Sequence, residues 1–285
     1  MVIIANWNGQ IMPLGEVRVP ALDRGYLFGE GIYEVLRVYG GRMWRADDHF
    51  ERMVTGVEEL GFDVSIPELR ARAEATLKES GLREALLYMQ VTRQDESRHH
   101  YYSKTAPVNC LIWVQPFDDP YKDQRETGVT CITYPDIRWR RNDLKATSLV
   151  ANCMAGQAAH THSAFESILV RDGLVTEGSR SSVFAVVDGK LMVPPSSRSV
   201  LPGITKRQVL ELCAKRGIAV IEKQLLLSDL HAVEELFLTA TPEEIIGIIR
   251  VDDQVIGSGK PGPVTRQLHA AFRETLGATH HVSNQ

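Results

Sequence analysis

The sequence has 285 residues, with 36 acidic and 32 basic side chains, a formal net charge of −4 and a hydrophobic share of 44%. This length predicts two domains with sizeable cores, and the well-mixed charges argue against binding to nucleic acid or an anionic membrane. No secretion signal or run of roughly 20 apolar residues is present, so a cytoplasmic location and small-molecule partners are predicted.

The first part of the chain predicts a largely antiparallel sheet with two helices. The β-prone runs are Val2–Trp7, Val17–Val19, Tyr33–Tyr39, Leu86–Thr92 and Cys110–Pro116. Asp47 is a candidate cap for an amphipathic helix that ends at Gly61. Pro67 opens a second predicted helix, which ends near Gly81.

A polar segment separates this part from the rest of the chain. Residues 119–127 are mostly charged or polar and include Pro120, a composition typical of an interdomain linker. We therefore expect a small N-terminal α/β domain over residues 1–118 and a larger C-terminal domain over residues 128–285, which carries Lys145.

The second part mixes strands and helices without a regular βαβ period. Its predicted strands are Val129–Tyr134, Ser167–Arg171, Ser182–Val187, Ala219–Lys223, Glu235–Ala240 and Ile245–Val251. Its predicted helices run from Ser148 to Thr161 and from Thr205 to Arg216. A mixed α+β fold describes this pattern better than a doubly wound sheet.

The four cysteines give no sign of a disulfide framework or a metal site. Cys110, Cys131, Cys153 and Cys213 lie far apart, without a CxxC pair and without a histidine at zinc-ligand spacing. We expect them to be buried thiols in a reducing compartment, and we expect no metal.

Lys145 and Glu177 are the first two candidates for chemistry. Lys145 is flanked by Leu144 and Ala146, and an apolar surrounding favours a nucleophilic lysine, although a solvated surface lysine has the same local sequence. Glu177 begins a glycine-containing turn between two apolar strands, where it is either a turn residue or a carboxylate held opposite a heterocyclic nitrogen.

Two predicted helix starts and one arginine suit an anion such as phosphate. Thr205 follows Gly203-Ile204 at the beginning of a helix, where backbone N–H groups lack intrahelical partners. Thr241 begins a Thr-Pro-Glu-Glu sequence that matches a capping box, which needs no ligand. Arg52 lies three residues after His49 on the first predicted helix and is either a phosphate ligand or a surface ion-pair partner.

Arg98 and His100 form a further basic pair. Both lie in a polar loop after a predicted strand, at alternating positions that allow the two side chains to face one anion. An exposed basic loop without a ligand accounts for the same pattern.

Taken in order along the chain, these segments resemble the fold-type IV pyridoxal phosphate enzymes, and among them the bacterial D-amino acid aminotransferases. The matching segments are Asp23–Val35, His49–Arg52, Val91–Arg93 with Arg98 and His100, Asp136–Trp139 leading to Lys145, Val175–Ser179, Leu201–Thr205 and Thr239–Thr241. They span nearly the whole chain. The resemblance implies a two-domain fold with pyridoxal 5'-phosphate at the domain interface.

The resemblance also implies a role for each candidate residue. Lys145 would carry the cofactor as a Schiff base, exchange the α-proton of the substrate and be the catalytic residue. The cofactor-binding residues would be Arg52, Lys145, Glu177, Leu201, Ile204, Thr205 and Thr241. Of these, Glu177 would face the pyridine nitrogen and Leu201 a face of the ring. Tyr33, Arg98 and His100 would bind the substrate carboxylate, with Arg98 and His100 supplied by the partner subunit of a homodimer.

The implied reaction is ping-pong transfer of an amino group from a D-amino acid, such as D-alanine or D-glutamate, to pyruvate or 2-oxoglutarate. Branched-chain L-amino acid aminotransferases, aminodeoxychorismate lyases and (R)-amine transaminases share the cofactor residues and are the alternatives. Arg180 departs from the family pattern beside the Glu177 turn and is a second candidate for an anionic substrate group.

Overall fold

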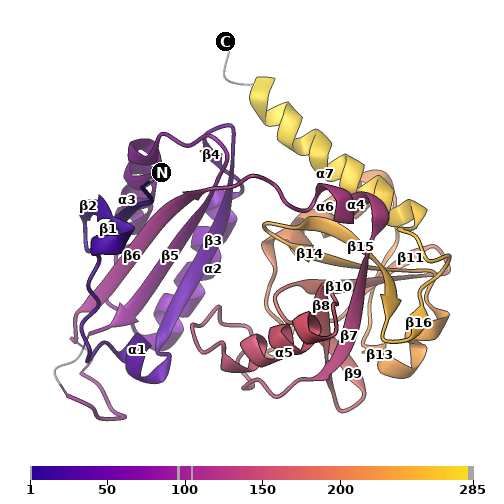
Figure 1. Ribbon diagram of the computed structural model, residues 1–285, viewed down its shortest axis with the longest axis horizontal. Helices are drawn as coiled ribbons and strands as arrows, with labels where there is room; N and C mark the ends of the chain where they lie inside the picture. The colour runs from indigo at the N-terminus through magenta and orange to yellow at the C-terminus, as the bar shows by residue number, and fades with distance from the viewer. Residues whose placement is uncertain (1, 95–96, 104, 282–285) are drawn as a thin grey trace. The chain divides into compact units, whose positions relative to one another are not determined.

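The computed structural model describes residues 2–94, 97–103 and 105–281, and the chain forms two compact units (Figure 1). The first unit comprises Met1–Asp118 and Leu144–Leu149, and the second comprises Asp119–Asp143 and Val150–Gln285. The segment Leu144–Leu149 contains Lys145, which we expected in the C-terminal domain. It groups with the first unit because its main chain pairs with a strand of that unit, as Thr147 N donates to Gly31 O over 2.9 Å.

The first unit contains a 6-stranded antiparallel sheet with the order β2-β1-β6-β5-β3-β4. The strands are β1 (Ile4–Trp7), β2 (Gln10–Pro13), β3 (Gly31–Tyr39), β4 (Arg42–Met43), β5 (Ala85–Arg93) and β6 (Val108–Pro116). The short helices η1 (Leu14–Glu16) and α1 (Arg24–Phe28) lie between β2 and β3 in the chain. The predicted strand Val17–Val19 is wrong, because these residues form no strand and follow η1 in irregular structure.

Two helices of the first unit, α2 (Ala46–Leu60) and α3 (Ile66–Ser80), pack against β3 and β6 (Figure 1). Alternate residues of β3 and β5, including Leu36 and Met89, meet helix residues such as Phe50 and Leu69 in one core. Gly61 and Gly81 end the helices with φ of +60° and +65°, which confirms both predicted ends. The predicted cap Asp47 is wrong, because the N-cap is Arg45, two residues earlier and in the left-handed region, and α2 begins at Ala46.

The second unit contains a 10-stranded mixed sheet. Its strands are β7 (Val129–Pro135), β8 (Glu166–Arg171), β9 (Leu174–Gly178), β10 (Ser182–Val187), β11 (Lys190–Val193), β12 (Val220–Glu222), β13 (Leu225–Leu226), β14 (Glu235–Ala240), β15 (Glu244–Val251) and β16 (Gln254–Val255). The order is β12-β11-β10-β14-β15-β7-β8-β9-β13, with β16 paired to β15. Parallel pairs at β7–β8 and β7–β15 occur beside antiparallel pairs, which confirms the mixed α+β prediction.

The helices of the second unit are α4 (Lys122–Thr127), α5 (Val150–Thr161), α6 (Ile204–Arg216), η2 (Leu227–Ala232) and α7 (Pro263–His281). Helix α5 packs against β7 and β8, and α6 and α7 pack against β14 (Figure 1). The predicted linker 119–127 therefore includes a helix. Arg125 of this helix pairs over 2.6 Å with Asp119, the first residue of the predicted linker, and donates to Glu243 O over 3.0 Å.

The capping box predicted at Thr241 is wrong, because no helix begins there. Residues 241–243 form a turn between β14 and β15, and Glu244 adopts a φ of +64° at the first position of β15. The two glutamates make ion pairs instead of capping: Arg180 pairs with Glu243 over 3.0 Å and Arg273 pairs with Glu244 over 2.7 Å.

The cysteine prediction holds at three of the four positions. Cys110, Cys131 and Cys213 are buried and free, and burial raises the pKa of Cys110 and of Cys213 to about 11. Cys153 is exposed on α5, so the expectation that all four thiols are buried is wrong. Within the described ranges, no helix is both long and apolar enough to cross a membrane, and no cluster of three potential metal ligands is found.

Candidate active site

Lys145 lies at the edge of the first unit's sheet, beside β3. Tyr33 N donates to Lys145 O over 2.9 Å, and Ala146 forms an isolated bridge with Ile32. The side chain is half-buried, and its Nζ lies 4.4 Å from the centroid of the Tyr33 ring. The backbone thus positions the amine against an aromatic face, and the apolar flank expected for this lysine is confirmed because Leu144 and Ala146 are buried.

A buried Glu34–His49–Arg52 triad lies on the same unit. Arg52 donates to both carboxylate oxygens of Glu34, from Nε over 2.7 Å and from Nη2 over 2.8 Å, and His49 Nδ1 lies 2.7 Å from Glu34 Oε2. Burial by itself raises the pKa of Glu34, but the charge and hydrogen bonds of Arg52, together with His49, outweigh it and lower that pKa to about 2. Arg52, predicted as a phosphate ligand, is therefore oriented by an ionised carboxylate.

His49 in this triad is a residue that the sequence analysis did not include in the site. Its side chain is fully buried, and burial lowers its pKa, so the ring is neutral near pH 7. A neutral imidazole that donates from Nδ1 to Glu34 leaves Nε2 as an acceptor, and within the described residues Nε2 has no hydrogen-bond partner. The i, i+3 spacing of His49 and Arg52 on α2 was the available signal.

The structure brings Arg98 and His100 together at one aromatic ring. The guanidinium carbon of Arg98 lies 5.2 Å from the centroid of Phe28, and the His100 ring meets Phe28 edge-on with centroids 5.6 Å apart. Both side chains are exposed. Tyr33 belongs to a different cluster, in which it contacts Lys145 and stacks on Tyr88.

In the second unit, Glu177 is the second-last residue of β9 and a buried carboxylate with two partners. Its Oε1 pairs with Arg138 Nη1, and its Oε2 accepts a hydrogen bond from Leu201 N over 3.1 Å. Arg138 is held in turn by Asp136 through two hydrogen bonds of 2.9 Å. Burial raises the pKa of Glu177, and the charge of Arg138 opposes this shift.

This arrangement explains two features of the sequence motifs. Leu201, predicted to lie against the cofactor ring, also orients the Glu177 carboxylate through its backbone N–H. Arg138 and Asp136 were part of the matching segments but were not included among the predicted site residues. No local signal identifies Arg138 as the ion-pair partner, because it lies 39 residues before Glu177.

The start of α6 has the features of a phosphate site. The N-cap of this 13-residue helix is Gly203, which has no side chain that could accept a hydrogen bond. The N–H groups of the first turn therefore have no side-chain cap. Ile204 and Thr205 are buried there, and Thr205 Oγ1 is a buried hydroxyl without a hydrogen-bond partner among the described residues. Helix dipole, open backbone donors and an unpaired hydroxyl together fit the phosphate of the expected cofactor.

Thr241, the other predicted phosphate residue of this unit, is half-buried in the turn that follows β14. Near the amino-terminal side of this turn, Thr239 Oγ1 is a second buried hydroxyl without a partner in the described part of the chain. The Thr241 hydroxyl therefore lies in a turn, whose backbone is not the helix start that the sequence suggested.

A hydroxyl-specific substitution tests the phosphate site. We expect Thr205→Val to weaken binding of pyridoxal 5'-phosphate about 10- to 100-fold, the effect of losing one hydrogen bond to a charged group of about 1.5–3 kcal/mol. The fold should be retained, because valine has nearly the same shape and the hydroxyl has no partner to lose in the described protein. Equilibrium dialysis measures the affinity. Thr161→Val, at an exposed position of α5, is the matched control. Equal affinities for both variants would remove Thr205 from the phosphate site.

Arg180, the second candidate for an anionic substrate group, is engaged by protein carboxylates. It lies 3.0 Å from Glu243 and 3.8 Å from Glu166, and its guanidinium covers the Phe165 ring at 5.0 Å. Both glutamates are buried, and burial raises the pKa of Glu166 to about 7 against the opposing charge of Arg180. Arg180 therefore already has carboxylate partners within the protein.

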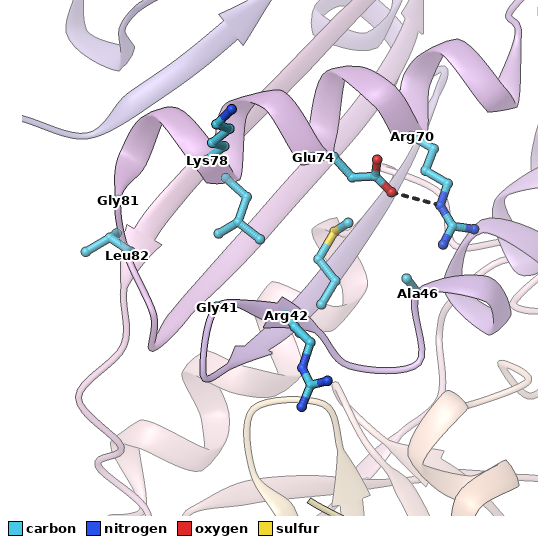
Figure 2. A pocket seen from close by; sticks show the side chains of 10 residues that line it. Gly41, Arg42, Ala46, Arg70, Glu74, Lys78, Gly81 and Leu82 are labelled. Atoms are coloured by element: carbon cyan, nitrogen blue, oxygen red, sulfur yellow. Dashed lines mark hydrogen bonds and ion pairs between the residues drawn. The ribbon is translucent and has the colours of Figure 1, made fainter. Parts of the chain in front are cut away.

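The first unit also has a pocket away from these residues. It has a volume of about 460 Å³ and lies between the β3–β4 turn and α3, and Arg70 and Glu74, both on α3, form an ion pair over 3.1 Å beside it (Figure 2). Its lining residues are Gly41, Arg42, Met43, Ala46, Arg70, Glu74, Leu77, Lys78, Gly81 and Leu82. None of the predicted site residues is among them.

The sequence is similar to known aminotransferases. A profile of the family described as Amino-transferase class IV matches residues 31–251. A D-alanine aminotransferase of Bacillus licheniformis is 38% identical over 274 residues, which are 95% of this chain and 96% of that protein. A D-alanine aminotransferase of Staphylococcus epidermidis is 34% identical over 94% of this chain and 96% of that protein.

Solved structures agree on the fold. A branched-chain amino acid aminotransferase of Escherichia coli superposes with a TM-score of 0.91 at 24% identity, over 100% of this chain and 98% of that chain. A branched-chain aminotransferase of Thermoproteus uzoniensis superposes with a TM-score of 0.86 at 25% identity, over 99% of this chain and 97% of that chain. These likenesses confirm the predicted fold class.

Proposed function

Because the chain belongs to the class IV aminotransferases, we propose that it transfers the amino group of a D-amino acid, such as D-alanine or D-glutamate, to a 2-oxo acid. Enzymes of this family use pyridoxal 5'-phosphate, so the predicted cofactor is confirmed. When bound, the cofactor supplies the electron sink that stabilises negative charge on the substrate α-carbon. The observation that carries the D-amino acid proposal is the 38% identity, over 95% of this chain, to a protein named D-alanine aminotransferase.

Lys145 is the proposed catalytic residue. Its Nζ takes the α-proton from the substrate and later returns it, which is general base and general acid catalysis by one amine. The main-chain bond to Tyr33 fixes the start of the side chain, and the Tyr33 ring covers the amine. The contact with the Tyr33 ring thereby limits where the amine rests.

Glu177 is the proposed partner of the pyridine nitrogen. An ionised carboxylate at this place keeps a proton on that nitrogen and thereby makes the ring a better electron acceptor. The charge of Arg138 opposes the effect of burial on the pKa of Glu177, and the Leu201 N–H fixes the orientation of its Oε2. Arg138 therefore acts through Glu177 as a positioning residue.

Arg52, Ile204, Thr205 and Thr241 are the proposed phosphate ligands. Glu34 orients Arg52 through two hydrogen bonds, and the α6 start offers backbone donors and the Thr205 hydroxyl. A guanidinium and a helix start are each a source of positive potential that suits a phosphate dianion.

The substrate carboxylate is proposed to bind Arg98, His100 and Tyr33. A guanidinium with two hydrogen-bonding neighbours is a sound carboxylate site. We propose that the enzyme is a homodimer in which Arg98 and His100 serve the active site of the other subunit. The predicted cytoplasmic location stays a prediction.

The choice of D-amino acids over the alternatives is supported by the relatives named D-alanine aminotransferase, at 38% and 34% identity. The branched-chain alternative is supported by the structural likenesses, which concern the fold. The test adds D-alanine, D-glutamate, L-leucine and L-glutamate separately to the cofactor-loaded protein and follows its visible absorbance. A change with the D-enantiomers alone is expected, and a change with L-leucine alone would assign the chain to the branched-chain group.

Arg98→Ala is expected to raise the KM for D-alanine about 10- to 100-fold and to change kcat by less than about 3-fold. The reason is that a charge-assisted hydrogen bond to the carboxylate contributes about 1.5–3 kcal/mol to substrate binding in both ground and transition states. Steady-state kinetics with saturating pyruvate measures both constants. Arg83→Ala, an exposed arginine of the same unit, is the control, and an Arg98→Ala enzyme with the control's KM would contradict the carboxylate role.

A further inference from the structure

Helix α1 is tied firmly to the first unit's sheet. Asp23 caps it by accepting hydrogen bonds from Gly25 N over 2.8 Å and Tyr26 N over 3.2 Å, and its other oxygen accepts from Thr92 on β5 and Asn109 on β6, both over 2.7 Å. A Cβ on Gly25 would lie 2.2 Å from the Thr92 methyl, so only glycine allows this approach. The helix is therefore a rigid platform.

From this platform, Arg24 binds the backbone of the loop that carries Arg98 and His100. The guanidinium donates to three consecutive carbonyl groups: His99 O over 2.5 Å, His100 O over 3.2 Å and Tyr101 O over 3.4 Å. Arg24 is 3% exposed although it binds an exposed loop. One buried cation thus fixes the main chain on both sides of the His100 Cα.

A second set of contacts orients Arg24 itself. Its Nε donates to Glu30 over 2.6 Å, and the other oxygen of Glu30 accepts from Arg93 Nε over 2.7 Å. Arg93 is fully buried at the end of β5, and its guanidinium lies 3.8 Å from the centroid of the Tyr102 ring. The loop is therefore held at its carbonyl groups by Arg24 and at Tyr102 by Arg93.

Phe28, the last residue of α1, holds the side chains of the same loop. Its ring contacts the Arg98 guanidinium at 5.2 Å and the His100 ring at 5.6 Å, and Arg24 lies 4.8 Å from its centroid. One short helix thus contributes a residue that binds the loop backbone and a residue that aligns the two exposed basic side chains.

We propose that Arg24 is a positioning residue for substrate binding, and that it acts with Phe28 to hold Arg98 and His100 in the conformation that binds the substrate carboxylate. This rests on the proposed role of Arg98 and His100. A loop that is ordered before the substrate arrives loses less conformational entropy on binding, so the effect is on affinity for substrate and not on the chemical step.

The test combines amide hydrogen exchange of the cofactor-loaded enzyme with kinetics. Arg24→Gln is expected to speed exchange of the amides in residues 97–103 and to raise the KM for D-alanine about 10-fold, with kcat and visible absorbance unchanged. Arg24→Lys keeps the positive charge beside Glu30 but has fewer N–H donors. Its loop exchange rate and its KM are expected to lie between those of wild type and Arg24→Gln. Arg18→Ala is the matched control, because Arg18 also donates to backbone carbonyl groups in this unit but is exposed.

The outcomes separate this inference from the proposed function. If Arg98→Ala raises KM and Arg24→Gln changes neither loop exchange nor KM, the positioning role is wrong and the proposed function stands. Faster exchange with an unchanged KM would also overturn the role. If Arg98→Ala leaves KM unchanged, the carboxylate site itself is wrong, whatever the exchange shows.

A second variant keeps the inference testable if Arg24 variants fail to fold. Phe28→Leu retains the apolar volume and the Arg24 hydrogen bonds but removes the ring that aligns Arg98 and His100. It is expected to raise the KM for D-alanine about 3- to 10-fold while the amides of residues 97–103 stay as protected as in wild type. An unchanged KM in this variant would overturn the inference.

Discussion

Replacing Lys145 by alanine is expected to lower kcat by about 10²- to 10⁴-fold or more, because the variant loses the amine that moves the α-proton. The fold should be retained, since the hydrogen bond from Tyr33 N to the carbonyl of residue 145 does not involve the side chain. The measurement is kcat for D-alanine with pyruvate, together with the visible absorbance of the protein after loading with pyridoxal 5'-phosphate.

A control on the cofactor bond accompanies this prediction. Borohydride reduction of the loaded wild type should fix the cofactor to the protein, and peptide mass analysis should place the added mass on the peptide that contains Lys145. Lys78→Ala, an exposed lysine of the same unit, should behave as wild type. Turnover and absorbance that both survive in Lys145→Ala would contradict the central assignment.

Glu177→Gln is expected to lower kcat about 10²- to 10³-fold, similar to the loss of one preorganised electrostatic partner in other active sites. The amide cannot hold a proton on the pyridine nitrogen, and it leaves Arg138 with Asp136 as its remaining carboxylate partner among those described. The KM for D-alanine should change little, because the carboxylate site is on other residues. Steady-state kinetics gives both constants.

Two variants separate the electronic role of Glu177 from a structural one. Glu222→Gln, an exposed glutamate of the same unit, is the matched control and should keep wild-type kinetics. Glu177→Asp retains the charge on a shorter side chain and is expected to recover part of kcat. A Glu177→Gln enzyme that is folded, cofactor-loaded and as fast as the control would show that the carboxylate is not the partner of the nitrogen.

Local chemistry was a reliable guide where one residue decides the backbone. Gly61 and Gly81 were predicted as helix ends, and both adopt the left-handed conformation that ends α2 and α3. Local patterns failed where distant partners compete. The Thr241 sequence reads as a capping box, but Arg180 pairs with Glu243 in a turn and Arg273 pairs with Glu244 at the start of β15. Both arginines are distant from that sequence in the chain.

The order of motifs along the chain determined the family, the cofactor and the identity of the candidate residues such as Lys145 and Glu177, because each motif is a short run of adjacent residues. Tertiary structure alone decided which groups orient them. Arg24 lies 75 residues before the His99 carbonyl that it binds, Arg52 lies 18 residues after Glu34, and Arg138 lies 39 residues before Glu177. No periodicity or local propensity links positions so far apart, since such pairs exist only once packed strands and helices bring them within hydrogen-bond distance.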